Sequence, residues 1–235
     1  MKPPRQIPLS LLSAAGHELE TFLPGEKNGE ALALVRAMAA GQGPFCLCLW
    51  GPPGSGKTHL LVGAAVSTPD WAPYVDLAEL TRLRIPGPPA TWLEGLEEPH
   101  LVCLDGLDAV IGQRPWEEAL FALYNRRLEL QAPILYASRA APVANDWALP
   151  DWASRCGACV SFGLSPPTDT ERLTILRTMA TQRGLELSPE AGRYLLHHCS
   201  RDMHRLAGIM DRLDDGALSA GRALTIPFIK ELLEF

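Results

Sequence analysis

The feature that most constrains this chain is a glycine-rich turn set between an apolar run and a helix-like segment. Residues 51–58 read Gly-Pro-Pro-Gly-Ser-Gly-Lys-Thr and match the pattern G-x-x-x-x-G-K-[ST] in full. In this context the glycines let backbone N–H groups surround phosphates, Lys57 neutralises the terminal ones, and the Thr58 hydroxyl can ligate Mg²⁺. The sequence therefore predicts a nucleotide-binding phosphate loop.

Beyond this loop, apolar runs alternate with helical patterns. Residues 100–105 form a continuous apolar run that ends in Asp105, and residues 134–138 form a similar run. Residues 116–130, which lie between them, carry apolar side chains at helical spacing. Alternation of this kind predicts right-handed crossovers and a parallel sheet flanked by helices. At the carboxyl end of its strand, Asp105 is placed to hold the water shell of a Mg²⁺ ion.

After residue 165 the pattern is purely helical. Residues 168–171 form a capping box, and Ser188 is followed by proline at the first helical position. A last short helix is expected from residue 225. The sequence thus predicts an α/β phosphate-loop domain with a parallel sheet, followed by a small all-α helical lid, which resembles the arrangement of the AAA+ ATPases.

Charge, cysteines and hydropathy exclude several classes. The net charge of −6, from 21 basic and 27 acidic residues, argues against a surface built to neutralise DNA. The six cysteines are expected to be buried reduced thiols, and Cys156 and Cys159, the C-x-x-C pair, lack the second pair that a zinc site needs. A redox pair is the minor alternative. The chain shows no signal-like or membrane-spanning run, so we expect a cytoplasmic protein without a membrane partner.

The position after Asp105 departs from the AAA+ pattern. Most AAA+ enzymes carry an acidic residue there that deprotonates the attacking water, whereas this chain has Gly106. Asp108 is the nearest following carboxylate and lies off the normal register. The sequence therefore predicts weak or absent intrinsic ATP hydrolysis.

Two segments that contain arginine resemble functional elements of AAA+ proteins. Residues 149–155 resemble the segment that presents an arginine finger to ATP in a neighbouring subunit, which makes Arg155 the catalytic candidate in trans. Residues 200–206 resemble the sensor-2 helix, with His204 or Arg205 directed at the nucleotide, because the register leaves both open. The sensor-1 loop at Ser138-Arg139 lacks the small acid or amide usual in the family.

Four stretches, together with the overall layout, are similar to the Hda family of DnaA-related AAA+ regulators. They are residues 6–11, 116–126, 149–155 and 224–231. The resemblance implies a negative regulator of bacterial replication initiation that binds the DNA polymerase III sliding clamp and stimulates hydrolysis of DnaA-bound ATP. It also implies that Phe22 or Leu23 forms an apolar wall beside the adenine.

The N-terminal segment has the features of a clamp-binding peptide. Pro8 favours an extended form, the glutamine supplies a directional hydrogen bond, and the aliphatic side chains can fill apolar pockets. The residues expected to contact the clamp are Gln6, Ile7, Leu9 and Leu11.

These interpretations give three regions: a clamp-binding tail (1–20), the AAA+ domain (21–165) and the lid (166–235). DnaA continues into a helix-turn-helix domain where this chain ends, so sequence-specific DNA binding is not expected. The residues expected around ADP or ATP are Gly51, Pro52, Pro53, Gly54, Ser55, Gly56, Lys57, Thr58, His59, Asp105, Phe22, Leu23, His204 and Arg205, with Thr58 and Asp105 at the Mg²⁺ site.

Several alternatives stay open at this level. A self-sufficient AAA+ ATPase, such as a helicase loader or DnaA-like remodeller, would need Asp108 or a neighbour to replace the missing base. A small-molecule phosphotransferase would need a substrate-binding insertion, which the helical tail argues against. The identity of the nucleotide, with ADP favoured, the presence of Mg²⁺ and homo-oligomer formation are likewise open.

Overall fold

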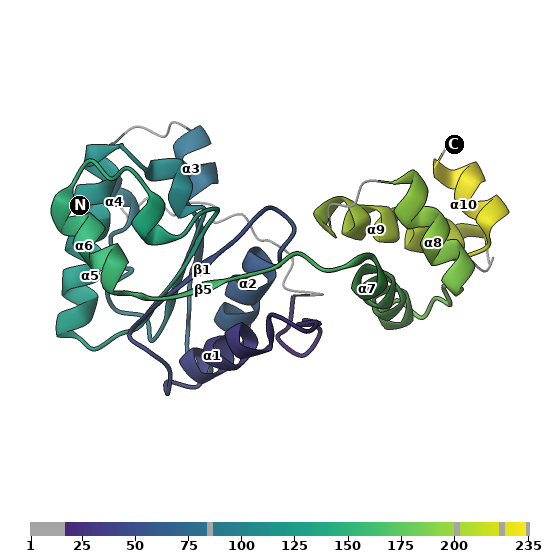
Figure 1. Ribbon diagram of the computed structural model, residues 1–235, viewed down its shortest axis with the longest axis horizontal. Helices are drawn as coiled ribbons and strands as arrows, with labels where there is room; N and C mark the ends of the chain where they lie inside the picture. The colour runs from purple at the N-terminus through teal and green to yellow at the C-terminus, as the bar shows by residue number, and fades with distance from the viewer. Residues whose placement is uncertain (1–16, 84–86, 200–202, 221–223, 234–235) are drawn as a thin grey trace, which may run out of the picture. The chain divides into compact units, whose positions relative to one another are not determined.

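The chain forms two compact units, the first ending at Ser165 and the second beginning at Pro166 (Figure 1). The computed structural model describes residues 17–83, 87–199, 203–220 and 224–233. Within these ranges no helix combines the length and the apolar character that crossing a bilayer requires.

The first unit is built on a parallel sheet. In the described residues its five strands run in the order β2-β3-β4-β1-β5, and each neighbouring pair is parallel. This order places β4 between β1, which leads into the phosphate loop, and β3, which ends at Asp105. The strands are β1 (Cys46–Trp50), β2 (Tyr74–Asp76), β3 (Val102–Asp105), β4 (Ile134–Ser138) and β5 (Val160–Gly163).

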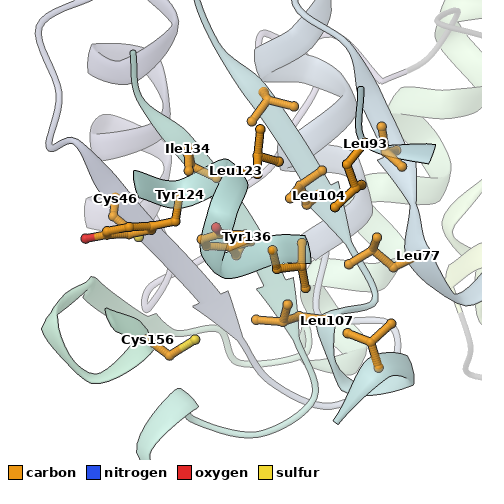
Figure 2. Packing of buried hydrophobic residues seen from close by; sticks show 14 of the residues in the cluster. Cys46, Leu77, Leu93, Leu104, Leu107, Leu123, Tyr124, Ile134, Tyr136 and Cys156 are labelled. Carbon is orange, nitrogen blue, oxygen red and sulfur yellow. The ribbon is translucent and has the colours of Figure 1, made fainter. Parts of the chain in front are cut away.

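Helices cover both faces of this sheet, because alternate strand residues point to opposite sides. In β1, Leu47 and Leu49 join a core formed with α1 and α2, whereas Cys46 and Cys48 join a core formed with α3, α5 and α6. Figure 2 shows part of the second core around Tyr124 and Tyr136. The elements flanking the sheet are α1 (Gly29–Ala39), α2 (Lys57–Ser67), α3 (Leu77–Leu83), α4 (Pro89–Trp92), η1 (Leu107–Val110), α5 (Arg114–Glu129), η2 (Pro142–Ala144) and α6 (Pro150–Ala158).

The expectation that the cysteines are all reduced is wrong, because Cys46 and Cys159 form a disulfide. β1 and β5 pair with Leu47 opposite Val160, so the two preceding cysteines lie side by side with their Cα atoms 5.0 Å apart. That separation lies within the range a disulfide spans. The partners are 113 residues apart in the chain, and only the strand register brings them together. The remaining cysteines are free, and Cys156 is therefore not paired within its C-x-x-C segment.

The second unit is a small helical bundle with its own core. Thr168 caps α7 in a complete capping box with Glu171, and the Ser188 hydroxyl accepts a hydrogen bond from the Ala191 N–H at the start of α8. Leu195, Leu206 and other buried aliphatic side chains from the helices fill the interior. The helices in the described part of this unit are α7 (Asp169–Gln182), α8 (Pro189–His198), α9 (Met203–Ala220) and α10 (Ile226–Leu233).

Candidate nucleotide-binding site

The phosphate loop joins β1 to α2 and packs closely against two other segments. Gly56 has a left-handed φ of 95°, and a Cβ atom there would lie 2.6 Å from the Phe22 ring. A Cβ atom on Gly51 would overlap the backbone carbonyl of Leu164. Glycine is therefore required at both positions, and the loop keeps the tight curl through which backbone N–H groups can surround phosphates.

Lys57, in the first turn of α2, reaches back into this loop. Its ammonium donates hydrogen bonds to the carbonyl oxygens of Gly51 (2.7 Å) and Pro52 (2.9 Å). Burial lowers the pKa of Lys57, and the nearby Asp105 and Asp108 carboxylates oppose this effect. The ammonium thus lies within the curl of the loop, where it fits a polyphosphate ligand.

The side chains of Thr58 and Asp105, the two residues predicted to hold Mg²⁺, are hydrogen-bonded to each other. The Thr58 hydroxyl, in the first turn of α2, donates to Oδ2 of Asp105, at the end of β3, at 2.6 Å. Tyr74, which the sequence reasoning missed, donates its hydroxyl to the same oxygen at 3.0 Å. Burial and the adjacent Asp105 raise the pKa of Tyr74, so its proton is retained in that hydrogen bond. The sequence carried no signal for Tyr74, because its contact with Asp105 depends on the pairing of β2 with β3.

The position after Asp105 offers no side chain. Gly106 has a φ of 71°, and its N–H donates to Asp105 Oδ1 at 2.7 Å. Asp108, the nearest carboxylate in the following turn, accepts from the Arg139 N–H at 3.0 Å and forms an ion pair with Arg139 Nε at 3.2 Å. The carboxylate considered as a replacement base is therefore engaged by the residue that follows β4.

An aromatic group borders the loop on the α1 side. Phe22 is buried, and its ring lies edge-on to the His59 ring with centroids 5.3 Å apart. His59 Nε2 lies 3.1 Å from the Glu18 carbonyl oxygen, and burial lowers the pKa of His59. Leu23, the other predicted wall residue, is 36% exposed. Phe22 is therefore the residue packed against the loop.

Arg155 lies on α6 and contacts aromatic side chains of α5. Its guanidinium is 5.9 Å from the Phe121 ring centroid and 5.6 Å from that of Tyr124. Contacts of this kind attract a cation to the ring face and restrict its orientation. Arg155 is therefore a partly exposed cation held at a defined place on the surface of the first unit.

A buried carboxylate fixes the segment that leads into α6. Glu117 is fully buried and accepts hydrogen bonds from the N–H groups of Gly112 (2.7 Å), Ala148 (3.1 Å) and Leu149 (2.7 Å). Because Leu149 directly precedes α6, Glu117 ties the start of the Arg155 helix to α5. The sequence reasoning did not single out Glu117, since a Glu within an amphipathic helix usually faces solvent.

The remaining predicted site residues lie elsewhere. Residues 6–11, with the clamp-contact candidates, lie outside the described residues. His204 and Arg205 fall in the first turn of α9 in the lid, and their contact with a nucleotide stays a prediction. No cluster of three or more metal-ligating side chains occurs within the described ranges. Mg²⁺ would therefore depend on Thr58, Asp105 and the phosphates themselves.

Comparison with known proteins shows which folds this chain is similar to. Residues 169–233 match the family model "Hda, lid domain". Domain III of Thermotoga maritima DnaA superposes with a TM-score of 0.76 at 19% identity, over 94% of this chain and 96% of that one. AMPPCP-bound DnaA from Aquifex aeolicus superposes with a TM-score of 0.67 at 21% identity, over 84% of this chain and 64% of that one. The Thermotoga maritima RuvB Holliday junction branch-migration motor superposes with a TM-score of 0.61 at 18% identity, over 87% of this chain and 66% of that one.

These matches confirm the predicted fold class, an AAA+ α/β domain followed by a helical lid. The lid match covers nearly all of the second unit, and the DnaA match extends over the first. The chain thus combines a fold like that of DnaA domain III with a lid that is similar to the lid domain of Hda.

Proposed function

We propose that this protein is a negative regulator of bacterial replication initiation that binds a nucleotide, favoured to be ADP, and promotes hydrolysis of ATP bound to DnaA. The observation that carries the proposal is a complete phosphate loop beside a base position occupied by Gly106. A site of this kind retains the groups that bind phosphates and lacks the carboxylate that activates water.

In its own site the chain would hold the nucleotide through the backbone of the phosphate loop and the Lys57 ammonium. Thr58 and Asp105 are the residues that would hold Mg²⁺, which supplies positive charge to the phosphates when bound. An adenine nucleotide is the ligand of choice because the related Aquifex aeolicus DnaA binds AMPPCP. Nucleotide at 100 times its dissociation constant would stabilise the fold by about 2.7 kcal/mol without turnover.

The catalytic contribution would come from Arg155, acting on ATP in the neighbouring DnaA subunit. Its guanidinium is partly exposed and lies over the Phe121 and Tyr124 rings, which restrict its orientation before a partner binds. An arginine supplied in trans offsets charge on the transferring phosphoryl group and is worth about 10³- to 10⁵-fold in rate. Arg155 acts by charge stabilisation, so this role needs no base in its own subunit.

Recruitment would use the N-terminal segment, with Gln6, Ile7, Leu9 and Leu11 binding a groove of the DNA polymerase III sliding clamp. The support for this step is the sequence pattern, an extended glutamine-led peptide with spaced aliphatic side chains. His204 or Arg205 of the lid would complete the nucleotide site.

Two measurements test the proposal: ATP turnover by the purified protein alone, and turnover of DnaA-bound ATP in the presence of DNA-loaded clamp. We expect slow turnover alone and strong stimulation of DnaA. Ordinary enzyme rates for the protein alone, abolished by Asp108→Asn, would instead support a self-sufficient ATPase. A Gln6→Ala, Leu9→Ala double variant should lose clamp binding and stimulation while keeping nucleotide binding.

A further inference from the structure

The backbone of Arg139 lies beside the start of the phosphate loop. It directly follows β4, the strand between β1 and β3, so it leaves the sheet between the loop and Asp105. The Gly51 N–H donates to the Ser138 carbonyl at 3.2 Å, which fixes the backbone before Arg139 against the first residue of the loop. An anion bound by the loop would therefore lie within reach of a long cationic side chain at this position.

The charged side chains around Lys57 balance one another. Lys57 experiences the Asp105 and Asp108 carboxylates and the Arg139 guanidinium, and Arg139 is paired with Asp108. Two cations thus face two carboxylates. Most AAA+ enzymes carry an acidic residue at the position of Gly106, so the surroundings of Lys57 hold one carboxylate fewer in this chain.

The exposure of the pair indicates that Arg139 can change partner. The Arg139 side chain is 74% exposed, against 24% for Asp108, and the ion pair is formed through Nε at 3.2 Å. Exposed ion pairs contribute little to stability, on the order of 0–1 kcal/mol. A phosphate offers a stronger interaction, because guanidinium and phosphate can form two charge-assisted hydrogen bonds.

We propose that Arg139 is a phosphate-binding residue of this site and makes nucleotide binding largely independent of a divalent cation. The inference rests on the proposed nucleotide-binding role and adds a determinant of ligand and metal preference. Arg139 supplies a positive charge that Mg²⁺ would otherwise bring to the phosphates. It also opposes, by repulsion, the binding of a metal ion next to Asp105.

The test is calorimetric titration of ADP into the full chain, once in Mg²⁺ and once in EDTA. For the wild-type protein we expect Kd values within about fivefold of each other in the two buffers. Arg139→Ala should weaken binding about ten- to a hundredfold in EDTA and less in Mg²⁺, the range of a hydrogen-bonded charge pair. Arg139→Lys should recover part of the loss. Arg126→Ala is the matched control, an exposed arginine paired with Glu129 at 2.9 Å.

Asp108→Asn separates a phosphate contact from a structural role. If Arg139 binds phosphate, this variant frees the guanidinium and should leave ADP binding in EDTA equal or tighter. If Arg139 only anchors Asp108, Asp108→Asn and Arg139→Ala should weaken binding alike, which would overturn the inference. Wild-type affinity of Arg139→Ala in EDTA would also overturn it.

Lys57→Ala distinguishes this failure from failure of the proposed function. If Lys57→Ala loses ADP binding and Arg139→Ala does not change it, only the role assigned to Arg139 is contradicted. Absence of nucleotide binding by the wild-type chain in both buffers contradicts the nucleotide-holding role itself.

Discussion

The side-chain amide of Asn28 forms two hydrogen bonds with the backbone of Ser165, 137 residues further along the chain. Asn28 Nδ2 donates to the Ser165 carbonyl at 2.9 Å, and Asn28 Oδ1 accepts from the Ser165 N–H at 3.0 Å. Asn28 is the N-cap residue of α1 and makes no side-chain capping bond there. The buried amide instead fixes the last residue of the first unit, next to the point where the lid begins.

Replacing Asn28 should therefore be costly. Asn28→Ala leaves two backbone groups of Ser165 without their partner, and we expect a loss of about 2 kcal/mol in the free energy of unfolding. The measurement is urea unfolding followed by circular dichroism. Asn145→Ala is the control, because Asn145 Nδ2 has no hydrogen-bond partner. Equal effects of the two variants would show that the Asn28–Ser165 contact is energetically unimportant.

Gly106 and Gly112 have similar backbone angles but different surroundings, so an alanine at each distinguishes backbone strain from steric crowding. Gly106 has a φ of 71° and a Cβ atom there would lie 3.3 Å from Ala78, whereas Gly112 has a φ of 74° and open space. At either position, the left-handed conformation costs an alanine about 1–2 kcal/mol. We expect Gly106→Ala to lower the urea midpoint more than Gly112→Ala. The reverse order would contradict the packing of Gly106 against α3.

The Cys46–Cys159 disulfide should lower the number of titratable thiols and raise the thermal stability of the protein. Under denaturing conditions without reductant, a thiol titration should report the four free cysteines, and all six after reduction. Cys159→Ser should lower the thermal midpoint, because the bond closes a long loop and is worth roughly 2–4 kcal/mol. Cys199→Ser, in the other unit, is the control. Six titratable thiols in the unreduced protein would rule the bond out.

His59 should make stability fall in mild acid. Burial lowers its pKa below the usual 6.5, so between the lowered value and 6.5 the unfolded chain binds more protons than the folded one. The free energy of unfolding therefore decreases as pH falls below about 6.5. In nucleotide-free buffer, His59→Gln should reduce the change in urea midpoint between pH 7.5 and 5.5. The exposed His197→Gln should keep the wild-type change, and a His59→Gln profile identical to wild type would refute this assignment.

The local patterns of the chain were readable from sequence, whereas its long-range pairings were not. The phosphate loop, the strand ending at Asp105 and the capping box of α7 depend on residues a few positions apart, and the motif context supplied their elements. Tyr74 and the Cys46–Cys159 disulfide depend on which strands are neighbours. The Asn28–Ser165 contact joins segments that no periodicity connects.

The same limit applies to the candidate site. The absence of a base at Gly106 could be read directly, but the engagement of Asp108 by Arg139 required the turn after β3 to be placed beside the end of β4. Likewise, sequence context makes Arg155 a candidate arginine finger, but the aromatic rings that its guanidinium contacts come from α5. Side-chain environment, set by packing between distant segments, was the part that sequence spacing could not supply.

The most direct test of the central claim is the rate of hydrolysis of DnaA-bound ATP with DNA-loaded clamp and the Arg155→Ala variant. We expect clamp and nucleotide binding to be retained and the stimulated rate to fall at least about a hundredfold, with little recovery in Arg155→Lys. Arg82→Ala should stimulate like wild type, because Arg82 is exposed on α3, which follows the edge strand β2, whereas α6 precedes the opposite edge strand β5. Undiminished stimulation by Arg155→Ala would contradict the account.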